Sequence, residues 1–442
     1  MISTFDGPFP FLEKRILSHS CIDELVQMLI KCRKEKDQIQ ALHLHSHICG
    51  CGLDGHRYLQ NYLVQLLVDV GAISDAQQVF DKILCKHESS WNSLIYGYTK
   101  CSKPQCALDL YDRMRENNSM HPSGHTVVAL FKACTKLVDL EQGLKIHASI
   151  SKCGLLEKDP FVGTSLIDMY AKCGAIDKAQ DVFGELPVRD VISWTTLIGG
   201  YVEHGHAEVA LKLFEGMQLE GMPPDASTYI CSLKACGNLG AAFKGLKIHA
   251  DIATKWCLGV HIVLDNTLID MYAKCGLLSV AQELFDKLSL RDVVSWNSLI
   301  AGYAQHGQSG HVFRIFQRML INGVEPDLVS FAIILHACSR MGLLKLSQTY
   351  FNVMSKDYGI IPTIDHHTSM VDLLGRVGQL DKAVIMINKS PVSNHIAIWR
   401  RVLDACKNWG NIELGKRTFE HAVHLIENND PASDRIYVKL GV

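Results

Sequence analysis

The stretch Asp292–Asp327, DVVSWNSLIAGYAQHGQSGHVFRIFQRMLINGVEPD, determines the fold class of this chain. Apolar residues at helical spacing predict a first helix from about 297 to 305 and a second from about 311 to 321. A glycine-containing turn at 306–310 separates them, and a Gly and a Pro end the second helix. A helix pair this short cannot bury its apolar surface alone, so it needs neighbours of the same kind.

The chain supplies such neighbours, because the same text recurs 102 residues further on. LIDMYAKCG begins at Leu166 and at Leu268, and GLKIHA begins at Gly143 and at Gly245. A Ser-Trp dipeptide also recurs, with its tryptophan at Trp91, Trp194 and Trp296. A long period built from helix pairs predicts an all-α, right-handed superhelical solenoid of stacked helix-turn-helix repeats.

Three kinds of repeat alternate within each period. Repeats with Ala-Cys in the first helix are expected at 22–56, 124–159, 226–261 and 328–363. Repeats with Tyr-Ala-Lys-Cys-Gly in their best copies are expected at 57–87, 160–190, 262–292 and 364–395. Repeats with Ser-Trp are expected at 88–123, 191–225 and 293–327. A short segment, 1–21, precedes these eleven repeats, and a further helix pair at 396–429 and a tail at 430–442 follow them.

Composition limits the classes of function. The net charge of −2 over 442 residues is not that of a typical nucleic-acid binder, so such binding would require Lys and Arg gathered on one face. Many of the 16 cysteines recur at fixed repeat positions, which favours reduced, buried thiols over disulfides. Those positions are Cys32, Cys134, Cys236, Cys338, Cys173 and Cys275. No apolar run has the length of a membrane span, and residues 1–20 match neither a secretory signal nor an Arg-rich transit peptide.

With VVSWNSLIAGY, LIDMYAKCG and GLKIHA in repeats of 35, 31 and 36 residues, the chain resembles plant pentatricopeptide repeat (PPR) proteins of the PLS subfamily. The resemblance covers most of the chain, and 396–429 resembles the E motif of that family. Tyr437-Val438 resembles the start of the next element, from which 439–442 depart. The family's DYW deaminase domain does not follow, so we expect a shortened member or an incomplete gene model.

The resemblance implies that the fifth and last residues of a repeat together recognise one base of single-stranded RNA. The implied pairs are Asn92 with Ser123, Thr164 with Asp190, Thr195 with Asp225, Asn266 with Asp292, and Asn297 with Asp327. The second residue of a repeat should flank the base, which selects Phe161, Ile192, Val263 and Val294. The Ala-Cys repeats carry apolar fifth residues that cannot hydrogen-bond a base through their side chains, namely Val26, Val128, Ile230 and Ala332.

Each of these assignments has a structural alternative. Asn and Thr are good helix N-caps and Asp favours a helix start, and chemistry alone favours capping over base recognition. The resemblance reverses that preference. The four flanking apolar residues could equally belong to the core between repeats.

Three enzyme-like motifs lack the context that their chemistry needs. GxGxxG at 50–55 follows a helical pattern and not a strand, and GxxxxGK at 410–416 is followed by Arg417 in place of Ser or Thr. HxE at 206–208 has no CxxC anywhere in the chain to complete a zinc site. We therefore expect no catalytic residue, no metal and no cofactor.

The resulting hypothesis is a single-stranded RNA-binding adaptor of the mitochondrion, or alternatively of the chloroplast. By resemblance it would specify sites of C-to-U editing, and a deaminase-bearing partner would bind 396–429. The family's pattern assigns U to Asn with Asp, G to Thr with Asp, and C to Asn with Ser, which gives 5′-C-n-G-G-n-U-U. The alternatives are RNA stabilisation, splicing or processing without editing, and a protein-binding scaffold.

Overall fold

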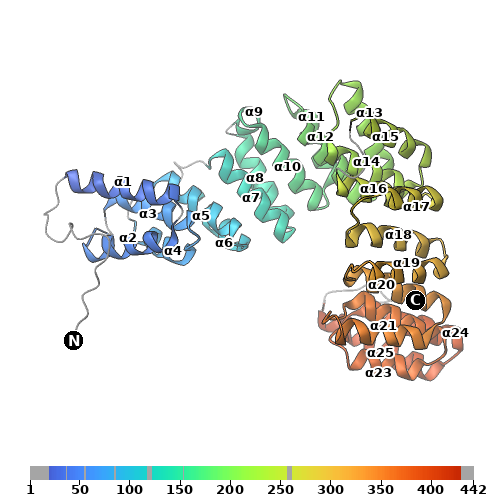
Figure 1. Ribbon diagram of the computed structural model, residues 1–442. Coiled ribbons are helices and arrows are strands. Elements are labelled where there is room, and N and C mark those ends of the chain that lie inside the picture. Colours follow the sequence, from blue (N-terminus) through green and yellow to red (C-terminus); the bar gives the residue numbers. More distant parts are fainter. Residues whose placement is uncertain are drawn as a thin grey trace. The chain divides into compact units, whose positions relative to one another are not determined.

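The computed structural model describes residues 19–35, 37–53, 56–83, 86–116, 122–152, 154–255 and 261–429. Within these ranges the regular elements are α-helices, numbered α1 to α25, and none is a strand (Figure 1). The predicted all-α fold class is therefore confirmed. Most of the expected N-terminal segment, 1–18, and the expected tail, 430–442, lie outside the described residues.

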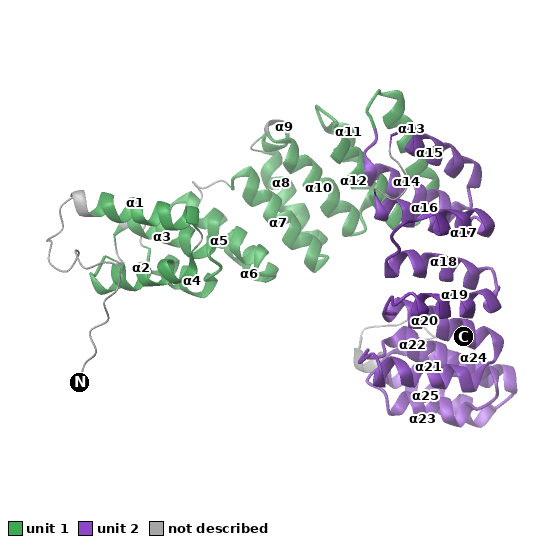
Figure 2. Ribbon diagram, viewed as in Figure 1, with its two compact units in different colours: residues 1–223 green, residues 224–442 purple. Residues whose placement is uncertain are grey.

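Residues 1–223 form one compact unit, and its helices alternate between two layers (Figures 1 and 2). The first helices of successive pairs pack side by side: α1 (His19–Glu35), α3 (Arg57–Asp69), α5 (Glu88–Lys100), α7 (Gly124–Leu137), α10 (Pro160–Lys172) and α12 (Val191–Glu203). The second helix of each pair packs on its own first helix: α2 (Gln38–Gly50), α4 (Ile73–Lys82), α6 (Pro104–Glu116), α8 (Leu140–Ser151), α11 (Ile176–Glu185) and α13 (Ala207–Leu219). A short helix, α9 (Leu155–Lys158), follows α8.

Residues 224–442 form the second compact unit, which has the same two-layer arrangement (Figure 2). Its first helices are α14 (Ala226–Leu239), α16 (Ile262–Lys274), α18 (Val293–Gln305), α20 (Leu328–Met341), α22 (Ile364–Arg376) and α24 (Ile396–Trp409). Its second helices are α15 (Ala242–Lys255), α17 (Leu278–Lys287), α19 (Ser309–Ile321), α21 (Leu344–Lys356), α23 (Leu380–Asn388) and α25 (Ile412–Asn429). Each compact unit is therefore a stack of helix pairs.

The helix α18 begins four residues earlier than the apolar pattern predicts. Asp292 is its N-cap and accepts a hydrogen bond from the backbone N–H of Ser295, while the Ser295 hydroxyl closes the capping box. This capping box sets where the helix starts, and an apolar pattern counted from Leu299 does not report it. At the other end Gly307 adopts a left-handed φ of 73°, which allows the chain to reverse into α19.

The repeats pack through a recurring aromatic pair and a recurring close approach. The ring of Trp296 on α18 packs edge-on against Phe285 on α17, with centroids 4.7 Å apart, and Trp194 packs in the same way on Phe183. Gly302 lets α18 approach α16 closely, because a Cβ at this position would lie 2.4 Å from the Cβ of Ala273. The absence of a side chain at Gly302 therefore allows these two adjacent first helices to pack closely.

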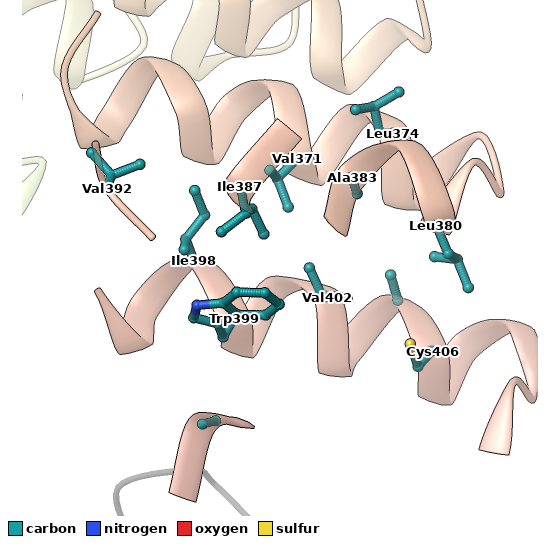
Figure 3. Close-up of a cluster of buried hydrophobic side chains, with 12 residues drawn as sticks. Val371, Leu374, Leu380, Ala383, Ile387, Val392, Ile398, Trp399, Val402 and Cys406 are labelled. Carbon is teal, nitrogen blue, oxygen red and sulfur yellow. The ribbon is translucent and has the colours of Figure 1, made fainter. Parts of the chain in front are cut away.

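The same packing continues into the last helix pair of the described chain. Ile398 and Val402 on α24 are buried against Val371 and Leu374 on α22 and Ile387 on α23 (Figure 3). The predicted helix pair at 396–429 is therefore stacked on the repeat before it, and α24 occupies the position of a first helix.

The cysteines at the recurring Ala-Cys position are core residues. Cys134, Cys236 and Cys338 are free and fully buried, and burial raises the pKa of each thiol to about 12. The expectation that these cysteines are buried in the core is confirmed for these three residues. None of the described helices combines the length and apolar character that a membrane crossing requires.

Candidate nucleic-acid interface

In two of the predicted pairs the fifth residue of a repeat contacts the last residue of the same repeat. The Nδ2 of Asn266 on α16 donates a hydrogen bond to Oδ1 of Asp292 at 3.0 Å. The Nδ2 of Asn297 on α18 donates to Oδ1 of Asp327 at 2.9 Å. Each pair lies at the junction with the next first helix, because Asp292 and Asp327 are the N-caps of α18 and α20.

A serine of the next repeat completes each pair. The Ser295 hydroxyl donates to Asn266 Oδ1 at 2.7 Å, and the Ser330 hydroxyl donates to Asn297 Oδ1 at 2.7 Å. An amide has two N–H donors and two carbonyl lone pairs, so each Asn keeps one donor and one acceptor. The sequence pattern does not predict Ser295 or Ser330 as site residues, although the recurrence of Ser before Trp is a signal for Ser295.

The carboxylate determines how the amide is oriented. Burial alone would raise the pKa of the Asp292 carboxyl, but hydrogen bonds from Ser295 and Asn266 outweigh it and lower that pKa below its ordinary value. An ionised carboxylate only accepts hydrogen bonds, so the Asn266 amide must turn its N–H group toward Asp292 and its oxygen toward Ser295.

The predicted flanking residues are exposed. Phe161 is 66% exposed, Val263 is 61%, Ile192 is 54% and Val294 is 50%. The alternative that they belong to the core between repeats is therefore wrong. Residues three apart share a face of a helix, so each apolar side chain neighbours the fifth residue of its repeat.

The asparagines beside these residues are much less accessible. Asn266 is 5% exposed and Asn297 is 7% exposed, while Val263 and Val294 on the same helices stand out from the surface. The polar pair is thus recessed beside an exposed apolar side chain, an arrangement that can hold the edge of a planar ligand while covering its face.

Two other predicted pairs are not joined by a hydrogen bond in the described residues. Thr164 donates to the carbonyl of Pro160 in its own helix at 3.2 Å, and Asp190 instead accepts from the backbone of Ser193 at 2.8 Å. A hydroxyl is shorter than an amide, which explains why Thr164 does not reach Asp190.

The predicted pair Asn92 and Ser123 is the second of these. Asn92 Oδ1 is buried without a hydrogen-bond partner, and the Ser123 hydroxyl accepts a hydrogen bond from the backbone N–H of Thr126 at 3.3 Å. The remaining pair is divided between the compact units, with Thr195 in the first and Asp225 in the second.

The capping alternative holds for the last residues of the repeats and fails for the fifth residues. Asp190, Asp225, Asp292 and Asp327 cap α12, α14, α18 and α20 through their side chains. The fifth residues lie more than one turn inside their helices, so they cap nothing. The last residue can therefore serve two roles at once, as an N-cap and as a partner of the fifth residue.

The segment with the HxE motif lies where the repeat alignment predicts a turn. His206 precedes α13 at its N-cap position and Glu208 lies in its first turn, after the turn that ends α12. Among the described residues no group of three or more His, Cys, Asp or Glu side chains is placed to hold a metal ion.

The stacked helix pairs and the recurring polar pairs define a helical-repeat solenoid with a periodic row of candidate binding positions. A model of the PPR repeat family matches residues 189–238 and 291–340, and a model of the PPR repeat matches 89–119, 164–191 and 266–293. The chain belongs to the pentatricopeptide repeat family.

Relatives from Arabidopsis thaliana extend over most of the chain. The pentatricopeptide repeat-containing protein At3g56550 is 34% identical over 91% of this chain and 69% of its own length. The mitochondrial protein At2g03880 is 34% identical over 93% of this chain and 64% of its own length. The chloroplastic protein CRR2 is 35% identical over 91% of this chain and 62% of its own length. The chain spans about half the length of some other relatives that it matches.

The fold also has a counterpart among solved structures. The crystal structure of the pentatricopeptide repeat protein PPR10 from maize superposes with a TM-score of 0.60 at 14% identity. The superposition covers 94% of this chain and 65% of the maize chain. At this identity the similarity shows a shared fold.

Proposed function

We propose that this chain is a sequence-specific adaptor that binds single-stranded RNA in a plant organelle. One observation carries the proposal. The recessed pairs Asn266–Asp292 and Asn297–Asp327 sit beside the exposed apolar residues Val263 and Val294 and repeat along the first-helix layer. A row of polar edges beside apolar faces suits unstacked bases, because each base offers a hydrogen-bonding edge and a flat aromatic face.

The hydrogen bonds already made in each site suggest which base it prefers. Asn297 keeps one N–H donor and one carbonyl lone pair after bonding Asp327 and Ser330. The edge of uracil offers a matching N–H group and carbonyl oxygen. At Thr164 the hydroxyl bonds its own helix, so Asp190 remains as the acceptor of that pair. A carboxylate suits the two donors on the edge of guanine.

The family pattern gives the base order 5′-C-n-G-G-n-U-U for the repeats from 88 to 327, and these preferences support its G and U positions. Asn92 with Ser123 takes C, Thr164 and Thr195 take G, and Asn266 and Asn297 take U. The positions marked n belong to Ala-Cys repeats, whose apolar fifth residues Ile230 and Val128 cannot select a base by hydrogen bonding.

We further assign the chain to the PLS subfamily with an E-type helix pair at 396–429. Its role would be to specify sites of C-to-U editing, and a deaminase-bearing partner would bind this helix pair and supply the catalysis. The names of two relatives, one mitochondrial and one chloroplastic, support an organelle, and we favour the mitochondrion. The purified chain should then lack deaminase activity and bound zinc.

The experiment is crosslinking of the protein to RNA inside its organelle, followed by sequencing of the bound RNA and measurement of editing in a null line. Enrichment of the predicted base order supports RNA recognition. Loss of editing at a cytidine near the bound site supports the editing role. Enriched RNA with unchanged editing would instead assign the chain to stabilisation, splicing or processing, and no enriched RNA would refute the proposal.

A further inference from the structure

The face that carries the fifth residues continues past the last repeat into a polar concavity. This concavity of about 570 Å³ lies between α22 and α24 and is lined by Asp372, Arg376, Arg401, Asp404, Asn408 and Trp409. Its volume falls within the range of about 300–1,000 Å³ of small-molecule sites. Its floor is the close approach of Gly375 to Ala405, where an added Cβ would lie 2.8 Å from the alanine.

The concavity is in register with the row of candidate base positions. Thr368, the fifth residue of the repeat 364–395, is followed at helical spacing by Asp372 and Arg376 on the same face of α22. Thr368 also lines a neighbouring concavity of about 560 Å³ together with Ala332 and His336. A strand lying along the first-helix layer would therefore reach the α22–α24 concavity next.

The concavity carries charges of both signs, with two arginines, Arg376 and Arg401, and two aspartates, Asp372 and Asp404. Arg376 is paired with Asp372 at 3.0 Å. Arg401 has no ion pair with a carboxylate anywhere in the described part of the chain, so its guanidinium is available to an anion.

Trp409 presents an aromatic surface at the edge of the same concavity. Its indole Nε1 donates to the carbonyl of Gly375 at 2.8 Å, and its ring lies against the turn at Gly378. These contacts fix the position of the ring, yet the residue remains 57% exposed. A tryptophan that served only to cap α22 would need no such exposed surface.

We propose that the concavity between α22 and α24 holds one further nucleotide of the bound RNA, beyond the repeat 364–395. The base stacks on Trp409, the phosphate binds Arg401, and Asp404 and Asn408 face the edge of the base. An aromatic face, an unpaired guanidinium and a polar edge group are the set of contacts by which proteins hold single-stranded nucleotides. The inference rests on the proposed RNA binding and extends it to the last described helix pair.

The test compares RNA lengths. The probes are 5′-NNCNGGNUUNN-3′, with N an equal mixture of bases and one nucleotide for each of the eleven repeats, and the same oligonucleotide with one adenosine added at either end. Fluorescence anisotropy at fixed salt should show that the wild-type chain binds one extended probe about tenfold more tightly than the core, because stacking on an aromatic side chain contributes at this level. The end that gives the gain identifies the direction of the strand.

The variants separate nucleotide binding from stability. R401A and W409A should lose the gain from the extension and keep their affinity for the core probe. R417A is the matched control, since Arg417 is an exposed arginine on α25 that does not line the concavity, and it should keep the gain. W409F keeps a stacking face but loses the hydrogen bond to Gly375, so it should also keep most of the gain.

A salt titration adds a readout that a structural role would not change. Loss of one phosphate contact in R401A should reduce the slope of log affinity against log salt by about 0.7 for the extended probe. The inference is overturned if R401A keeps the full gain and slope, or if R417A loses as much as R401A. Failure of the wild-type chain to bind the core probe overturns RNA binding itself, and the inference with it.

Discussion

Asn297 donates its side-chain amide to Asp327 at 2.9 Å, although the two residues are 30 positions apart in the chain. The contact joins the fifth residue of one repeat to its last, and Ser330 of the next repeat holds the other end of the same amide at 2.7 Å. The candidate recognition element therefore spans a repeat junction. Its geometry depends on how two adjacent first helices are stacked.

Removing the Ser330 hydroxyl should weaken base discrimination. In Ser330→Ala the Asn297 amide loses the partner that fixes its oxygen, so we expect the preference for U over C at this position to fall about three- to tenfold, as for the loss of one neutral hydrogen bond. Ser298→Ala on α18 is the matched control and should retain the preference. Paired U and C probes in an anisotropy titration would show the effect, and equal discrimination by both variants would count against the role of Ser330.

Closing the gap between α16 and α18 should destabilise the stack. Gly302→Ala places a Cβ 2.4 Å from the Cβ of Ala273, and overpacking of this kind costs about 1–3 kcal/mol. Gly310→Ala on α19 meets nothing within 4 Å, so its better helix propensity should raise stability by up to about 1 kcal/mol. Thermal unfolding should therefore move the two variants in opposite directions. A lower melting temperature for both would show that the local packing is not what distinguishes them.

The fold could be predicted from the sequence, because the 102-residue period shows that the helix pairs recur. Each pair is too short to bury its apolar surface without a neighbouring pair. The apolar pattern placed the start of α18 too late, since the first turn of that helix depends on the capping box of Asp292 and Ser295 and not on apolar periodicity. The boundaries of helices are set by hydrogen bonds that periodicity does not report.

The candidate site was less accessible to sequence reasoning. Pattern alone could not decide whether Val294 was core or surface, because an apolar residue in the first turn fits both, and the structure leaves it 50% exposed. The pattern also could not distinguish a base-recognising fifth residue from a helix N-cap. In the structure Asn297 lies inside α18, whereas Asp327 is the N-cap of α20. The contact of Ser330 with Asn297 depends on inter-repeat stacking, which no single repeat encodes.

Acid should destabilise the chain through half-buried histidines. His147 accepts or donates a hydrogen bond with the Tyr170 hydroxyl at 2.7 Å, and His249 does so with Tyr272 at 2.8 Å. Burial lowers the pKa of both histidines in the folded chain. The unfolded chain then binds more protons as the pH falls below about 6.5, so stability is complete above that pH and is lost as the pH decreases toward the folded pKa values.

The measurement is thermal unfolding between pH 8 and pH 5 for the wild type and for His147→Gln combined with His249→Gln. The wild type should lose stability on acidification, and the double variant should show a shallower dependence because two of the titrating groups are gone. An identical pH dependence in the two proteins would assign the acid sensitivity to other groups.

The central claim is that Asn297 recognises a base, and the most direct test is the exchange of its amide for a hydroxyl. In Asn297→Thr we expect the hydroxyl to turn to its own helix, as Thr164 does, which exposes the Asp327 carboxylate to the donors of guanine. A gel shift at fixed salt with paired probes that carry U or G at this position measures the ratio of affinities, and Ser298→Thr serves as control. The account predicts a change of roughly tenfold toward G in Asn297→Thr and none in Ser298→Thr. If Asn297→Thr and the wild type rank the two probes with the same ratio, Asn297 does not recognise the base and its amide only joins adjacent repeats.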